Sequence, residues 1–70
     1  MALELDARAH TAAARDLLAF EGVGMAEAVL ASARGREGFR AALALEIRRL
    51  PAGEPNRGET LRRWRAEARE

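Results

Sequence analysis

Cysteine, lysine and tyrosine are absent from this 70-residue chain, and histidine occurs once. Without cysteine the chain forms no disulfide and no cysteine-ligated zinc site, and His10 alone does not make a histidine metal site. Serine and threonine together occur only at Thr11, Ser32 and Thr60. No nucleophile stands out with a base to activate it, so we expect no enzyme, no cofactor and no bound metal.

Long apolar runs are also missing: none approaches the ~18 residues of a membrane span. The first ten residues carry acidic side chains where a signal peptide carries basic ones. We therefore expect a cytoplasmic protein without a membrane partner. A chain of this length forms one domain at most, and so small a domain buries little surface. We expect a second copy or another partner to cover part of it.

All twelve basic residues are arginines, and they are unevenly distributed along the chain. Residues 1–33 carry two arginines against five acidic residues, a net charge of −3, whereas residues 34–70 carry ten against six, a net charge of +4. Arginine is a planar, bidentate donor to carboxylates and phosphates, although GC-rich codon usage also produces a chain rich in alanine and arginine. The asymmetry predicts that the two halves face different partners.

The first residues alternate in the manner of a strand. In MALELDA, Leu3 and Leu5 lie on one side and Ala2, Glu4 and Asp6 on the other, which is the period of a half-buried strand. Nothing else in the chain has a strand pattern, and a lone strand needs a partner. The predicted partner is the same strand of a second copy.

Four helical patterns follow, separated by glycines and prolines. We predict helices over about residues 8–21, 25–34, 37–50 and 57–69. Gly22 is predicted to end the first helix as its C-cap, and Gly24 to precede the second. Pro51 ends the third, because the residue before a proline disfavours the helical region. His10 is interpreted as a surface or capping residue. The predicted fold is thus mainly α, with one short strand.

The order strand, helix, glycine turn, helix is that of a ribbon-helix-helix dimer, whose paired strands enter a DNA major groove. Over residues 1–33 the chain resembles the VapB-type antitoxins of bacterial toxin–antitoxin pairs. Ala2 and Leu3 match the start of that family's strand, ARDLLAF its first helix, Gly22 its turn glycine, and EAV at 27–29 the opening of its second helix. The resemblance implies a homodimer. Its predicted core consists of Leu3, Leu5, Leu17 and Val29.

The resemblance also implies binding of operator DNA by the outward strand residues, with help from free backbone N–H groups at the start of the second helix. The residues in these positions are Ala2, Glu4, Asp6, Met25 and Ala26. Glu4 and Asp6 put four carboxylates on the dimer ribbon, which opposes the phosphate field of DNA. Because glutamate also accepts a hydrogen bond from cytosine, operator binding stays open at this point.

In the antitoxin family a C-terminal arm neutralises the toxin, which is usually a ribonuclease. Here a dimerisation domain over 1–50 and a linker over 51–58 precede an arm, residues 59–70, with a narrow apolar stripe and arginines beside it. An aromatic anchor with bidentate arginines suits an acidic cleft on a toxin or another protein. The predicted partner-binding residues are Leu61, Arg62, Trp64, Arg65, Ala68 and Arg69.

Other interpretations are open. Trp64 and Leu61 could instead pack back on Phe39 or Leu43, with the arginines solvated. MALELDA could begin the first helix, because alanine, leucine and glutamate all favour helix. The chain is then a small all-helical interaction or assembly protein, which docks on an acidic protein surface without DNA binding. In a third interpretation the arginines bind RNA, and the acidic residues among them count against this.

Overall fold

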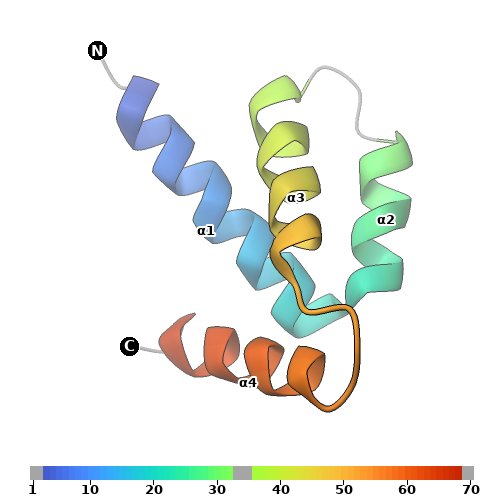
Figure 1. The fold of residues 1–70 in the computed structure, drawn as a ribbon. Coiled ribbons are helices and arrows are strands. Elements are labelled where there is room, and N and C mark those ends of the chain that lie inside the picture. The colour runs from blue at the N-terminus through green and yellow to red at the C-terminus, as the bar shows by residue number, and fades with distance from the viewer. Residues whose placement is uncertain (1–2, 33–35, 69–70) are drawn as a thin grey trace.

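The chain folds into four α-helices in the computed structural model, which describes residues 3–32 and 36–68 and the side chains within them from residue 7 onward. The helices are α1 (Leu3–Glu21), α2 (Val23–Ser32), α3 (Glu37–Arg49) and α4 (Asn56–Ala68). α1 packs against each of the other three helices, α2 packs against α3, and α4 crosses beneath them against α1 (Figure 1). None of these helices is long and apolar enough to cross a membrane.

The predicted N-terminal strand is wrong, and with it the ribbon-helix-helix fold. The described residues contain no strand, and Leu3–Asp6 form the first turns of α1. The reason is local: a helix satisfies its backbone hydrogen bonds within one chain, and leucine, glutamate and the alanines that follow favour helix. Pairing of Leu3 and Leu5 across a dimer sheet is therefore excluded as the dimer core. Ala2 lies outside the described residues.

Gly22 makes the sharp reversal between α1 and α2. Its φ of +95° lies in the left-handed region that favours glycine, and its N–H donates to the Leu18 carbonyl at 3.1 Å. This confirms the predicted C-cap. α2 begins immediately afterwards at Val23, so Gly24 lies within α2 and not before it.

The third predicted helix, 37–50, agrees closely with α3. It ends at Arg49, and Leu50 takes an extended conformation before Pro51, as the proline predicts. α4 begins at Asn56, within the predicted linker. Near its start the Glu54 carboxylate accepts a hydrogen bond from the Gly58 N–H at 3.1 Å, and a negative charge there suits the helix dipole.

The hydrophobic core lies where α1, α2, α3 and α4 converge. Its buried members are Ala14, Leu18, Ala19, Ala26, Leu43, Leu50 and Trp64. Alanine at three of these places lets the helix backbones approach closely, and Leu61 and Phe39 pack against the same cluster. Trp64 therefore packs into the intramolecular core, where α4 contacts α1, while direct packing of Trp64 on Phe39 or Leu43 stays a prediction. Leu17 and Val29, predicted for a dimer core, also pack half-buried against this intramolecular core.

We predict opposite effects of alanine at the two glycines near the first reversal. Gly22→Ala should lower the free energy of unfolding by about 1 kcal/mol, because a side chain is strained at positive φ. Gly24 is helical with open space around the position of a Cβ, so Gly24→Ala should raise it by roughly 0.5–1 kcal/mol. Urea unfolding followed by circular dichroism measures both. Shifts of the same sign would contradict this turn.

Two leucines of α3 make a second matched pair. Leu43 is fully buried and Leu45 is 45% exposed. Leu43→Ala should cost about 2–5 kcal/mol, a large part of the stability of so small a domain, and should lower the urea midpoint or abolish the helical signal. Leu45→Ala should change the stability by about 0.5 kcal/mol or less. Equal losses from the two variants would show that α3 packs through another face.

Candidate functional site

A buried carboxylate lies at the centre of the molecule. Glu46 of α3 is only 1% exposed. Its Oε1 accepts a hydrogen bond from the Arg15 Nε of α1 at 2.8 Å, and its Oε2 accepts one from the Arg49 Nη1 at 3.0 Å. An isolated charge in such a place would be very unfavourable, so both oxygens need these donors.

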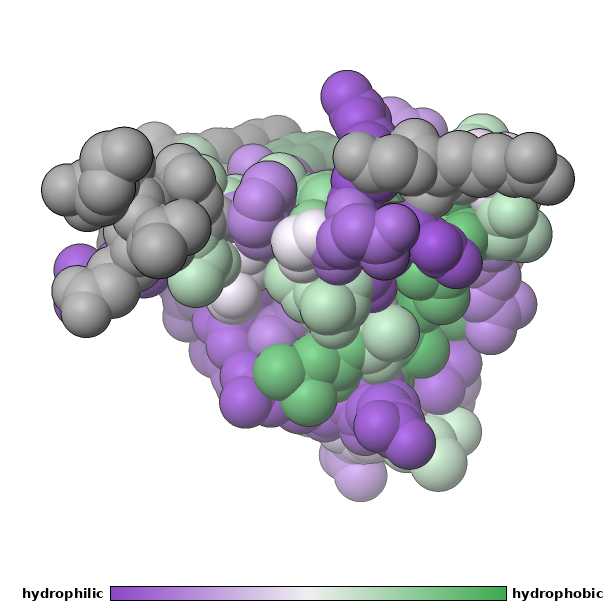
Figure 2. All heavy atoms as spheres, turned by 90° about the horizontal axis from the view of Figure 1, so that it is seen from above, coloured by the Kyte–Doolittle hydropathy of each residue, from purple (hydrophilic) through white to green (hydrophobic). Residues whose placement is uncertain are grey.

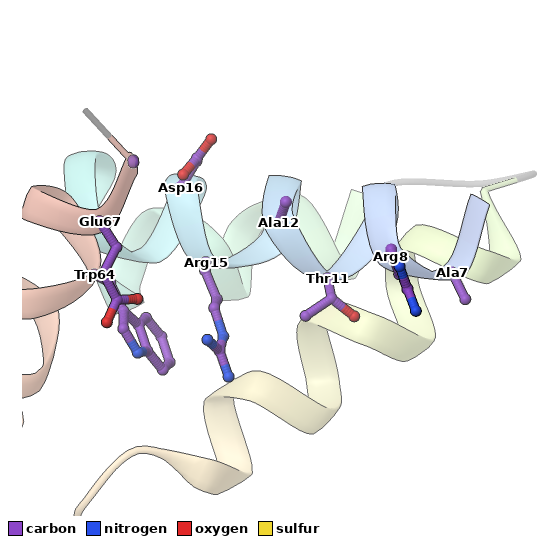
Figure 3. Close-up of a pocket in the computed structure, with 9 residues that line it drawn as sticks. Ala7, Arg8, Thr11, Ala12, Arg15, Asp16, Trp64 and Glu67 are labelled. Carbon is purple, nitrogen blue, oxygen red and sulfur yellow. The ribbon is translucent and has the colours of Figure 1, made fainter. Parts of the chain in front are cut away.

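The same arginine joins α4 to this cluster. The Arg15 guanidinium carbon lies 4.7 Å from the centroid of the Trp64 ring, within the range of a cation–π interaction. Figure 3 shows the two side chains turned toward one another from α1 and α4. Arg15 therefore connects α3 and α4 through α1, and we call Arg15, Glu46, Arg49 and Trp64 the charged core. These groups are engaged with one another, which suits a structural role.

A hollow of about 450 Å³ lies beside the charged core, between α1 and α4. Trp64 and Arg15 form one end of its wall, and small side chains such as Ala12 and Thr11 form much of the rest. Its charged groups are separated: Arg8 lies toward the start of α1, while Asp16 and Glu67 lie near Trp64 (Figure 3). The described residues include no cluster of metal-binding side chains. The hollow therefore offers apolar contact with opposite charges at its two ends.

The opposite side of α1 packs closely on the beginning of α3. The His10 imidazole lies so near Gly38 that a Cβ on this glycine would be 2.7 Å from the Nε2 atom. His10 is half-buried, so it is a helix–helix contact, which the interpretation as a surface or capping residue missed. On the face seen from above in the orientation of Figure 1, hydrophobic residues reach the surface between hydrophilic ones (Figure 2).

Two arginines of α4 contact other groups of the chain, and two others form no ion pair among the described residues. Arg57 donates to the Pro51 carbonyl at 3.0 Å, and Arg63 lies 3.9 Å from Glu67. Arg62 and Arg65 are exposed and stand three residues apart, and no ion pair involves them among the described residues. We call Arg62 and Arg65 the arginine face.

The predicted partner-binding residues are thus divided by the fold. Trp64 is 7% exposed and Leu61 half-buried, whereas Arg62, Arg65 and Ala68 are exposed. The Trp64 side chain is buried in the core, and Arg62 and Arg65 remain on the surface. Arg69 lies outside the described residues.

The predicted DNA-binding residues do not form a site in this structure. Glu4 and Asp6 lie on α1 and not on a ribbon. Ala26 is fully buried, and its backbone N–H donates to the Gly22 carbonyl at 3.1 Å, so the prediction of a free N–H there is wrong. Met25 is half-exposed on α2. The physical reason is that α2 begins two residues earlier than predicted, which places Ala26 inside the first hydrogen-bonded turn.

The charged core was missed at the sequence level, although one signal for it is present. Glu46 stands three residues after Leu43 and four before Leu50, so it belongs to the apolar stripe of α3. An acidic residue in such a stripe indicates a buried charge that needs a basic partner. Which of twelve arginines supplies it depends on how the helices cross.

Comparison of the chain with protein-family models, with curated proteins and with solved structures finds no match in any of the three.

We predict that the charged core stabilises the fold. Arg15→Met should cost about 2 kcal/mol, because a buried carboxylate oxygen loses its charged donor. The double variant Arg15→Met/Glu46→Leu should recover part of this loss, since it removes the buried charge as well. Arg63→Met, which breaks the exposed pair with Glu67, is the control and should cost about 0.5 kcal/mol or less.

Urea unfolding of the three variants, followed by circular dichroism, distinguishes the effects. If Arg15→Met were no more harmful than Arg63→Met, the Arg15–Glu46 contact would have no role in stability. If the double variant were less stable than Arg15→Met, the remaining Arg49–Glu46 pair would be stabilising without Arg15.

Proposed function

We propose that this chain is a small helical interaction domain that binds an acidic surface of another protein through the arginine face of α4. The observation that carries the proposal is the division of α4 by the fold. Its apolar side, with Trp64 and Leu61, packs inward, and this leaves Arg62 and Arg65 on a helix that is held in place.

The chemistry of this face favours carboxylates as ligands. α4 carries four arginines against two glutamates. A guanidinium binds a carboxylate with two parallel hydrogen bonds, and the three-residue spacing of Arg62 and Arg65 suits two acidic groups about one helical turn apart. Exposed pairs of this kind are screened by salt, so binding should weaken as ionic strength rises.

The same surface is less suited to nucleic acid. Glu59 and Glu67 are exposed on α4 among the arginines. Asp16 of α1 lines the hollow together with Glu67 and Ala68, near the C-terminal end of α4. A phosphate backbone carries a continuous negative charge that would extend over these carboxylates, whereas two acidic groups one helical turn apart need to meet only Arg62 and Arg65. A toxin with acidic groups in its active site would be one partner of the proposed kind, bound without the ribbon of the antitoxin family.

We predict that neutralising the arginine face removes this binding. Fluorescence anisotropy of a labelled polyglutamate peptide should show that Arg62→Gln/Arg65→Gln lowers the affinity about fivefold to tenfold, since two charge-assisted pairs are lost. The matched control is Arg36→Gln/Arg48→Gln, which removes the same charge from exposed positions at the ends of α3 and should change the affinity by less than about twofold.

Two outcomes would contradict the proposal. Equal losses in both double variants would mean that net charge alone, and not the arginine face, attracts the peptide. Tighter binding of a single-stranded RNA than of polyglutamate at the same salt concentration would support the RNA interpretation instead.

A further inference from the structure

A second hollow, of about 470 Å³, lies between α1 and α3, and we call it the α1–α3 hollow. Ala7 and Thr11 of α1 line it together with Ala41 and Leu45 of α3, and its described lining residues include no arginine, aspartate or glutamate. Leu45 is 45% exposed, one of three large apolar side chains that the described part of the chain leaves at the surface. The α1–α3 hollow is therefore an uncharged, largely apolar site that is open to solvent.

Arginines lie beside the α1–α3 hollow on both helices. Arg8 is exposed on the first half of α1, and Figure 3 shows its side chain turned toward α3. Arg48 is exposed three residues after Leu45, which places the two on neighbouring positions of the α3 surface. At the beginning of α3 the exposed Arg36 and Glu37 offset one another in charge. The hollow thus suits an apolar side chain that has carboxylates next to it.

The chain itself carries such a side chain at the end of α1. Phe20 is 48% exposed on the last turn of this helix. Asp16 stands four residues earlier on the same side of the helix, Glu21 follows Phe20 directly, and both are exposed. Residues 16–32 contain three acidic residues and no basic one. We call Phe20, Asp16 and Glu21 the acidic knob.

We propose that copies of this chain associate head to tail, with the acidic knob of one copy docked in the α1–α3 hollow of the next. The phenylalanine ring contacts Leu45 and the alanines of the hollow, and the two carboxylates pair with Arg8 and Arg48. Charge complementarity favours a second copy as the occupant, because the knob is acidic and the hollow has an arginine on each helix. An aromatic anchor in an apolar site with charged groups around it is the usual centre of a protein interface.

The docking surfaces are two different parts of the molecule. The α1–α3 hollow lies along the first half of α1, and the acidic knob lies at its other end, near the start of α2 (Figure 1). Such a contact is heterologous, so each pair of copies keeps one free knob and one free hollow. Association therefore continues into open chains of copies, or into a ring if the rotation closes. The contact uses helices only, unlike the strand pairing that the structure excludes.

This inference does not rest on the proposed function of α4. Arg62 and Arg65 are not among the residues that line the α1–α3 hollow. The arginine face is nevertheless a second basic surface, so its double variant is a control for self-association. Arg62→Gln/Arg65→Gln should weaken polyglutamate binding and leave the association of copies unchanged.

Sedimentation velocity at concentrations up to about 1 mM, the weak end of specific association, tests the knob and the hollow. For the natural chain the sedimentation coefficient should rise with concentration, without a plateau at the dimer. Phe20→Ser removes the apolar anchor and should weaken association about tenfold or more. Met25→Ser is its matched control, because Met25 is 49% exposed on α2, and it should change nothing.

The hollow has its own matched pair of variants. Leu45→Glu places a carboxylate between α1 and α3, where it repels the acidic knob, and should also weaken association about tenfold or more. Ala31→Glu adds the same charge at an exposed position of α2 and should leave association unchanged. Circular dichroism of each variant checks that it is folded.

Mixing the two altered chains gives the sharpest result. The Phe20→Ser chain keeps its hollow and the Leu45→Glu chain keeps its knob, so together they should form a one-to-one heterodimer that grows no further. A monomer at all concentrations, equal effects of Phe20→Ser and Met25→Ser, or a mixture without heterodimer would overturn the proposal. Association that is lost in Arg62→Gln/Arg65→Gln but kept in Leu45→Glu would also overturn it, since the knob would then bind the arginine face.

Discussion

The carboxylate of Glu46 is held between two guanidinium groups, and the arrangement of α1, α3 and α4 depends on this contact. Arg15 of α1 donates to it at 2.8 Å, and its guanidinium carbon lies 4.7 Å from the centroid of the Trp64 ring of α4. Removing Arg15 therefore loosens two helix contacts at once. A chain of 70 residues has few large apolar side chains, and this cluster organises a core that otherwise consists largely of alanine and leucine.

Small residues determine how closely the helices around this cluster approach. Ala14 and Ala26 are fully buried, and Gly38 admits the His10 ring against the backbone of α3. Gly22 reverses the chain with a single residue between α1 and α2. The tight reversal and the close approach of the helix backbones give a compact helical domain. Tertiary packing supports each helix in it.

Because the Trp64 side chain is buried in the core, it is not available on the surface as an aromatic anchor for a partner. With the aromatic ring packed against Arg15, α4 presents Arg62 and Arg65 outward.

Local sequence patterns were sufficient to predict most of the helices and the breaks between them. The periodicity of Leu43 and Leu50, the glycine at 22 and the proline at 51 predict helices and breaks close to those observed, because caps and proline act within a few residues. Tertiary structure decided the rest. Residues 3–6 alternate for barely one helical turn, too short a pattern to distinguish strand from helix, and the choice depends on whether pairing partners exist. The direction of Trp64, the burial of Glu46 and the selection of Arg15 as its partner depend on how helices far apart in the chain cross, which no local pattern contains.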